Sequence, residues 1–466
     1  MLDPDLVRHT LRTALATGGR FAEVFAEERI STSIRLDDGR IEEVVAGSDR
    51  GAGVRVFDGE SQAYAFSNRL DPAALARAAE AAASAAANAT VKPTNGPAAV
   101  DLTRSEPIRH PVTSPPDRVP TDRKVGWLKE AEDAARSFDS SVAQVLVGYA
   151  DSLQRMLVAN SDGTWVEEER PRVRLIVQVV AVRDGVVQTG FEGPAGLTGV
   201  ELFERFPVAQ TARRAADMAV TMLDGRPAPA GEMPVVVGPG GGGVLFHEAC
   251  GHGLEVDHIH KDASIYRLEQ RGSKLASSLV NGVDDGTVPS AWGSIGVDDE
   301  GTPGERTVLF DEGVLTGFLY DRLRADHDGV ESSGNGRRQS YAHLPIPRMR
   351  NSYILAGQMD PADVLSDTRR GVYAKTLGGG QVNPATGDFV FGVAEGFLIE
   401  DGRITTPVKG ANLIGNGPAI LSAIDAVADD FETRDGICGK EGQGVPVSNG
   451  SPTLRIARMT VGGTDA

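Results

Sequence analysis

The chain of 466 residues is too long for one ordinary domain, and its hydrophobic fraction of 40% is enough to form buried cores. Its net charge of −18, from 65 acidic and 47 basic side chains, argues against binding to nucleic acids or anionic membranes, which requires a basic surface. With only two cysteines, no signal-peptide core and no apolar stretch of membrane-spanning length, the sequence predicts a soluble protein of the reducing cytoplasm.

The first half of the chain predicts an α+β domain over residues 1–226. Alternation of apolar and polar residues over 21–66, with turns at Asp38-Gly39 and Asp58-Gly59, predicts a run of antiparallel hairpins. The proline-rich stretch 107–120 reads as an extended connector. Further elements follow from the same signals: helices over 5–17, 71–87, 121–136 and 209–223, and strands over 143–158, 164–169 and 173–182.

The segment Pro227-Ala228-Pro229-Ala230-Gly231 indicates a domain boundary, so a second, β-rich domain is expected over 232–466. A short buried strand is predicted at 233–237, before a glycine run and the helix described next. Other strands are predicted at 307–310, 317–320, 389–393, 396–400 and 453–461, and helices near 360–366 and 418–428.

The glycine run Gly238–Gly243 satisfies the pattern G-x-G-x-x-G, which suggests a dinucleotide site. That fingerprint requires a complete βαβ unit, and the segments that follow do not predict one. We therefore favour the alternative that these glycines permit close packing around the next helix.

The stretch Phe246–Gly253 places two imidazoles and a carboxylate close together in a segment predicted to be helical. Neutral imidazole is a common zinc ligand, and Glu248 beside His247 could accept a proton from a metal-activated water. The histidines are five positions apart, however, and a regular α-helix would set them about 140° apart around its axis. A π-like turn would bring His247 and His252 to one face, and Gly251 would lower the resistance to that distortion.

A metal site of this kind needs a third ligand, because catalytic zinc usually has three protein ligands and one open position. Without one, the histidines could simply be structural. The candidates are Cys250 inside the motif and Cys438 in a glycine-rich segment, where Lys440 would favour the thiolate. Residue chemistry favours Cys438, while Cys250 remains either an alternative ligand or a small buried residue.

Several further motifs, taken together, resemble the TldD-type metalloproteases of the TldD/PmbA family, also described as the modulator of DNA gyrase family. Ordered matches extend over most of 234–463, with a weaker match at 51–56. The segments that carry the resemblance are His247–Glu255, Asp298–Gly304, Gly334–Tyr341, Gly378–Val382, Pro407–Ala411 and Cys438–Gln443.

The resemblance implies a zinc metalloprotease with one Zn²⁺ per chain, in which His247, His252 and Cys438 bind the metal and Glu248 is the catalytic base. It also implies an unfolded or modified peptide as substrate, and a homodimer or a heterodimer with a metal-free relative. His258 and His260 are additions to the family pattern. Because they lie in a polar segment, 257–262, we expect both at the surface.

In this interpretation an extended peptide adds as a strand to the β-rich domain, and Glu248 takes the proton of the attacking water. Oxyanion support could come from the polar run 336–345, although a salt-bridge patch explains that run equally well; its candidates are Arg337, Arg338, Tyr341 and His343. Two other functions remain open: a metal-dependent amidohydrolase acting on non-peptide amides, and a non-catalytic binding subunit of a protease assembly.

Overall fold

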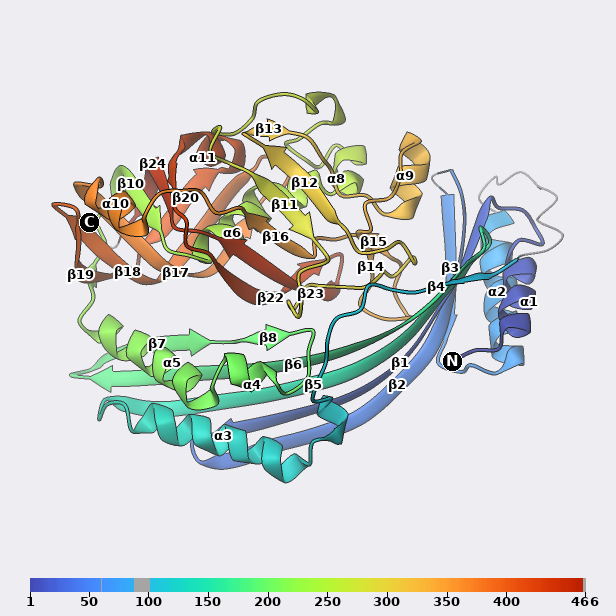
Figure 1. Ribbon diagram of the computed structural model, residues 1–466, viewed down its shortest axis with the longest axis horizontal. Coiled ribbons are helices and arrows are strands. Elements are labelled where there is room, and N and C mark those ends of the chain that lie inside the picture. The colour runs from blue at the N-terminus through green and yellow to red at the C-terminus, as the bar shows by residue number, and fades with distance from the viewer. Residues whose placement is uncertain (60, 88–100, 464–466) are drawn as a thin grey trace.

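The computed structural model describes residues 1–59, 61–87 and 101–463, and its fold is α+β (Figure 1). A long curved sheet built from the first half of the chain runs beneath the more compact second half, with helices on its outer side. Among the described residues of the first half, the helices are α1 (Pro4–Ala14), α2 (Pro72–Ala87), α3 (Thr121–Arg136), α4 (Leu202–Arg205) and α5 (Val208–Leu223).

The curved sheet has eight strands in the order β3-β2-β1-β5-β6-β4, with β7 and β8 also paired to β6. Neighbours in sequence pair antiparallel, and β1 joins the two halves of the sheet by pairing with β5. The strands are β1 (Phe21–Asp37), β2 (Arg40–Asp58), β3 (Ser61–Ser67), β4 (Thr103–Ser105), β5 (Val142–Asn160), β6 (Thr164–Arg183), β7 (Val186–Glu192) and β8 (Ala195–Gly196).

The predicted hairpins at 21–66 are confirmed, and the turn between β1 and β2 lies at Asp38-Gly39, both with positive φ. The predicted separation of strands 164–169 and 173–182 is wrong, because β6 continues through Pro171, which pairs with Leu153 of β5. The φ of proline is compatible with a strand, and proline lacks only the backbone N–H. A strand can therefore contain proline at a position where no backbone N–H has to bond to the neighbouring strand.

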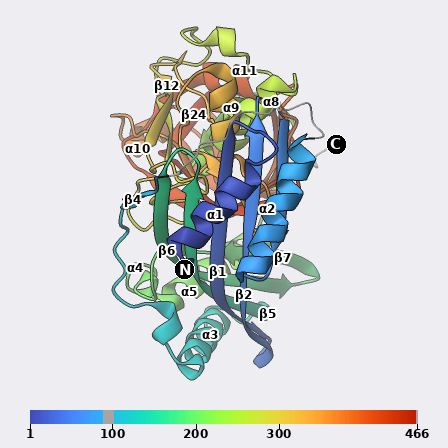
Figure 2. The same cartoon turned by 90° about the vertical axis from the view of Figure 1, so that its right-hand side faces the viewer.

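Two pairs of helices cover the sheet at different ends, as the turned view in Figure 2 makes clear for α1 and α2. Val7, Leu11 and Leu75 from these two helices are buried against Val24 and Val54 of the strands. At the other end, apolar residues of α3 and α5 pack on β5 and β6. The predicted helices therefore form because each has an apolar face that the sheet buries.

The second half contains an eight-stranded sheet in the order β17-β10-β24-β20-β18-β19-β9, with β21 on β24, and a six-stranded sheet in the order β13-β12-β11-β16-β23-β22. The strands of the first are β9 (Arg226–Pro227), β10 (Gly231–Val237), β17 (Arg370–Val382), β18 (Asp388–Glu400), β19 (Arg403–Lys409), β20 (Asn412–Asn416), β21 (Ile424–Val427) and β24 (Leu454–Gly462). Those of the second are β11 (Gly282–Asp285), β12 (Arg306–Asp311), β13 (Val314–Leu315), β16 (Asn351–Ile354), β22 (Glu432–Lys440) and β23 (Gln443–Ser451), and β14 (Gly336–Arg337) pairs with β15 (Ile346–Pro347).

Three predictions in this half are wrong. The strands expected at 389–393 and 396–400 are one continuous strand, β18. Residues 317–320 form no strand, and Leu319 makes only an isolated bridge with Glu255. The helix expected to reach 428 is α11 (Gly417–Ala423), which gives way to β21 because Ile424–Val427 pairs with β24. The helix near 360–366 is confirmed as α10 (Pro361–Ser366). The boundary proposed between 226 and 232 stays a prediction.

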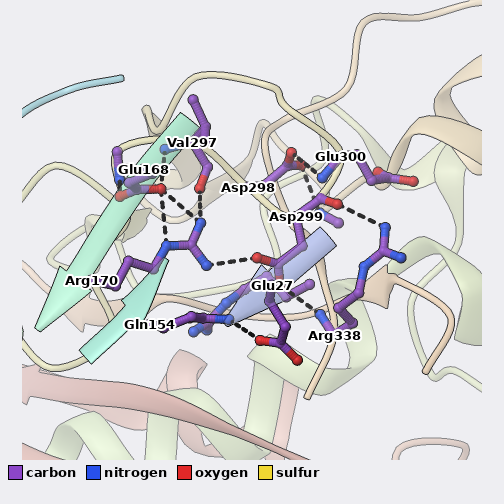
Figure 3. Close-up of polar contacts among 12 residues, drawn as sticks. Glu27, Gln154, Glu168, Arg170, Val297, Asp298, Asp299, Glu300 and Arg338 are labelled. Carbon is purple, nitrogen blue, oxygen red and sulfur yellow. Dashed lines mark hydrogen bonds and ion pairs between the residues drawn. The ribbon is translucent and has the colours of Figure 1, made fainter. Parts of the chain in front are cut away.

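A network of buried charges joins the curved sheet to the second half (Figure 3). Arg170 of β6 binds Glu168 at 2.9 Å and Asp299 at 2.6 Å, and it donates to the carbonyl of Val297. Arg338 reaches across to Glu23 of β1 and to the carbonyl of Asp299. These side chains are all buried, and they lie beside an apolar cluster in which Phe25 and Met156 of the sheet pack with Val297 and Tyr341, so matched charges and apolar packing both hold the contact.

Glu201, just before α4, fixes the proline-rich connector to the curved-sheet domain by accepting hydrogen bonds from the amides of Thr113 and Ser114. Burial raises the pKa of Glu201, but the amides of Thr113, Glu201 itself and Gly199 and the Thr198 hydroxyl lower it to about 2, below its usual 4.5. The depressed pKa adds stability that is complete above pH 4.5 and is lost as the pH falls toward 2.

Glu201→Gln is therefore expected to lower the free energy of unfolding by about 1–2 kcal/mol at pH 7, after allowance for solvent screening. The difference from the parent should shrink steadily below pH 4.5. Denaturant unfolding at several pH values would measure it, with exposed Glu204→Gln on α4 as the control. A pH-independent difference would contradict the assignment.

Candidate metal centre

The segment that carries the two motif histidines leaves β10 through a turn at Gly240, whose φ of 82° suits glycine. It then forms α6 (Gly241–Phe246), a π-helical turn η2 (His247–Gly251) and α7 (His252–Leu254). The predicted π-like turn is thus confirmed. A wider turn places residues five apart on one face, and the rings of His247 and His252 lie with their centroids 5.0 Å apart.

The glycines around this helix are required by close packing. A Cβ at Gly243 would lie 2.3 Å from the backbone nitrogen of Gly450 on β23, and one at Gly251 would lie 2.0 Å from the sulfur of Met349. Gly251 has an ordinary helical φ of −52°, so its role is to make room for Met349 rather than to ease the π distortion. The packing interpretation of the glycine run is confirmed.

Gly243→Ala is expected to destabilise the protein by about 1–3 kcal/mol, because the new methyl group would meet backbone atoms that cannot move aside locally. Gly126→Ala in α3 is the matched control: its Cβ would meet no atom within 4 Å, and alanine favours the helix by up to about 1 kcal/mol. Thermal unfolding of both variants measures the difference. A neutral Gly243→Ala would show that α6 is not tightly packed on β23.

Cys438 reaches the same place from β22 in the six-stranded sheet. Its sulfur lies 3.3 Å from Nε2 of His247 and 3.4 Å from Nε2 of His252, and all three residues are buried. The three potential ligand atoms lie within 4.8 Å of one another. The structure therefore brings His247, His252 and Cys438 together, as expected from the sequence.

The two cysteines have opposite environments. Burial raises the pKa of Cys438, but the imidazoles of His247 and His252 outweigh this and lower it to about 4. Burial raises the pKa of Cys250 to about 12, and its thiol interacts with Tyr266 in the core. Cys250 is absent from the group of converging ligand atoms, so it is a packing residue at this centre.

Glu248 lies at the edge of this group. One of its carboxylate oxygens is 3.9 Å from Nε2 of His252, and the side chain is 26% exposed, whereas that of His252 is 10% exposed. The carboxylate is thus close to the converging ligand atoms and still reaches solvent. That position suits a group that exchanges protons with water beside a metal.

A second layer of charges, which the sequence analysis missed, holds the centre in place. Oε2 of Glu255 lies 2.9 Å from Nδ1 of His252, and the ammonium group of Lys440 binds Glu255 at 3.0 Å and Asp257 at 2.6 Å. Burial lowers the pKa of His252, but Glu255 and Cys438 outweigh it and raise that pKa well above its usual value. The spacing of three residues from His252 to Glu255 was the available signal, since it matches one helical turn.

The predicted surface position of the added histidines is only half correct. His260 is exposed, but His258 is partly buried, and Asp257 in the same segment is fully buried against Lys440. Lys440, which was expected to favour the Cys438 thiolate, instead binds the carboxylates of Glu255 and Asp257. The polar composition of 257–262 predicted a solvent-facing segment, but Asp257 is buried because Lys440 pairs with its charge.

The polar run 336–345 is used for packing. Arg337 donates to the carbonyl of Met349, and Arg338 belongs to the charge network that joins the two halves. The hydroxyl of Tyr341 contacts Asp49, and His343 contacts Ser340. These contacts favour the salt-bridge interpretation of the run over an oxyanion role.

No helix in the described ranges is long and apolar enough to cross a membrane.

Three family models match the chain: PmbA/TldA metallopeptidase domain 1 over residues 22–86, the central domain over 114–223 and the C-terminal domain over 230–463. The last match contains all four residues His247, Glu248, His252 and Cys438.

The chain is 39% identical over 457 residues to the Metalloprotease TldD homolog of Haemophilus influenzae, covering 96% of this chain and 93% of that protein. It is 36% identical over 447 residues to a metalloprotease of Methanothermobacter thermautotrophicus, covering 95% and 96%. Among solved structures, TldE from Thermococcus kodakarensis shares the fold, with a TM-score of 0.75 and 20% identity over 98% of this chain and 99% of that chain.

Proposed function

Because the chain belongs to the PmbA/TldA metallopeptidase family, we propose that it is a zinc-dependent peptidase that hydrolyses unfolded or modified peptides bound in extended form. The observation that carries the proposal is the convergence of Nε2 of His247, Nε2 of His252 and Sγ of Cys438. Glu248 lies beside these atoms and is not one of them.

The donor set fits zinc. In tetrahedral coordination, zinc–sulfur and zinc–nitrogen distances place the two donor atoms about 3.5 Å apart. The observed sulfur–nitrogen distances are 3.3 and 3.4 Å. His247, His252 and Cys438 would hold the ion and leave the fourth position open. When bound there, zinc supplies a Lewis acid that lowers the pKa of water and polarises a carbonyl.

The protein side chains then handle the proton and hold the geometry. Glu248 accepts the proton of the attacking water and returns it to the leaving amine. Glu255 fixes the ring of His252 through Nδ1, so that Nε2 faces the open site. Lys440 neutralises Glu255 and Asp257, which allows these carboxylates to stay buried beside the centre.

The position of Cys438 supports binding of an extended peptide. It lies on β22, the last strand of the six-stranded sheet, and a terminal strand can receive a further strand along its outer edge. A cavity of about 470 Å³ adjoins the start of β22 and helix α6, with Val244, Glu432 and Arg434 in its lining. A peptide that follows β22 would pass from this cavity to the ligand group.

Cys438→Ala should lose the zinc ion of this centre and the cleavage of an unstructured peptide mixture, whereas Cys250→Ala should keep both. The two substitutions remove the same thiol from two buried positions, and only the first removes a proposed ligand. Zinc content by elemental analysis and fragments by mass spectrometry are the measurements. Zinc-loaded protein that cleaves no peptide but hydrolyses small amides would favour the amidohydrolase alternative.

The cytoplasm remains the proposed compartment, because both described cysteines are free thiols, which a reducing environment maintains. We also propose that the chain forms a homodimer or a heterodimer with a metal-free relative. Apolar side chains exposed on the curved sheet support this proposal, among them Val44 and Val45 of β2 and Val187 of β7. Light scattering of the purified chain, alone and with the relative, would separate the two assemblies.

A further inference from the structure

A second group of metal-ligating side chains lies where helices α8 (Val256–His260) and α9 (Arg322–Asp328) meet. Nε2 of His260 lies 3.0 Å from Oδ1 of Asp328, and Nδ1 of His327 lies 2.7 Å from the same oxygen. The two imidazole rings have centroids 4.8 Å apart. Figure 1 and Figure 2 both show α8 and α9 as neighbours at the upper surface of the second half.

We propose that His260, His327 and Asp328 form a second binding site for a divalent transition metal, distinct from the centre at Cys438. Their candidate ligand atoms all lie within 4.8 Å of one another, so one ion can be reached by all three. Two imidazoles and one carboxylate are a donor set used for zinc and for ferrous iron. The set contains no sulfur, which distinguishes it chemically from the first centre.

The carboxylate is oriented for this role. The Tyr320 hydroxyl donates to Oδ2 of Asp328 at 2.9 Å and so fixes the carboxylate, whose Oδ1 lies near both imidazoles and whose Oδ2 is also 3.1 Å from Nε2 of His260. Such an outer hydrogen bond is typical of metal-ligating carboxylates. The side chain of Asp328 is 13% exposed, that of His260 22% and that of His327 41%, so ions from solvent can reach the group. Among the described residues, the ion-pair partners of Asp328 are these imidazoles, so neutral rings leave its negative charge available.

An ion at this site would join the segment that follows the first centre to the rest of the domain. α8 begins directly after α7 and carries Asp257, which binds Lys440. Bridging His260 to α9 would hold α8 at its far end. The second ion is therefore a structural clamp on the helix that supports the ligand segment, and its presence does not depend on peptidase activity.

Cobalt titration of the metal-free chain tests the proposal, because a thiolate ligand adds a near-ultraviolet charge-transfer band to bound Co²⁺ and imidazole and carboxylate do not. We expect two equivalents of Co²⁺ to bind, one with that band and one without it. Equilibrium dialysis with Zn²⁺ should likewise give two ions per chain. Tyr320→Phe should weaken the sulfur-free site about tenfold through loss of the outer hydrogen bond.

The variants separate the two sites. His327→Ala and the isosteric Asp328→Asn should each remove the band-free equivalent and keep the charge-transfer band, whereas Cys438→Ala should remove the band and keep the other equivalent. Exposed His9→Ala on α1 is the control and should still bind two ions. A single equivalent in the parent chain, or a band-free equivalent that survives both His327→Ala and Asp328→Asn, would overturn the proposal.

Discussion

Replacing Glu248 with glutamine is expected to lower the rate of peptide cleavage by a factor of about 10²–10⁴ while the bound zinc is retained. Glutamine has nearly the same shape but cannot accept a proton. The carboxylate of Glu248 is 3.9 Å from Nε2 of His252 and lies outside the group of three converging ligands, so its loss should leave metal binding intact. Single-turnover cleavage of an unstructured peptide and zinc analysis of the same sample give both quantities.

Glu269→Gln is the control for this experiment, since Glu269 is an exposed glutamate in the segment that follows the metal helices. It should cleave at the parent rate. Full cleavage by the zinc-loaded Glu248→Gln variant would show that another group takes the proton. Loss of zinc from that variant would instead make Glu248 part of the binding set, contrary to the geometry described above.

Arg170→Met is expected to have the largest effect on stability, lowering the free energy of unfolding by about 3–5 kcal/mol. Methionine keeps much of the side-chain volume but removes the charge. Glu168 and Asp299, each with a side chain 5% exposed, would then lose the guanidinium that neutralises them between the two halves of the chain. Denaturant unfolding measures the loss.

Arg155→Met gives a matched comparison on the neighbouring strand β5. Arg155 binds Glu169 at 2.8 Å, but the two side chains are 43% and 59% exposed, so solvent screens the pair. The expected loss is about 0–1 kcal/mol. Equal losses for the two variants would mean that the buried network in Figure 3 contributes no more than a surface ion pair.

The elements with strong local signals were predictable. The helix at 121–136 follows from its periodicity and coincides with α3, and the turn at Asp38-Gly39 forms because both residues tolerate positive φ. The predictions were wrong where pairing with another strand decides the secondary structure. Residues 424–427 continue a helical pattern, yet they form β21 because the edge of β24 is available to them.

The candidate centre was partly predictable in the same sense. The spacing of His247 and His252 demanded a π turn if they were to share a ligand, and the structure contains that turn. The spacing of His252 and Glu255 signalled that pair, but the contact of Glu255 with Lys440, 185 positions away, could not be read from the sequence. The contact of His260 with His327 could not be read from the sequence either, because the two residues lie on separate helices.

The sequence by itself therefore determined the residue types of the centre, the local helix distortion and the α+β character, since these depend on neighbours within a few positions. Tertiary structure alone decided that Cys438, 191 positions from His247, completes the group, and that Arg170 and Arg338 bridge the two halves. The physical reason is that burial and neighbouring charges set the pKa of a charged group or a thiol and decide which partners it binds. Whether Lys440 faces water or two carboxylates, and whether a cysteine packs or binds, depends on which segment, distant in sequence, lies against it.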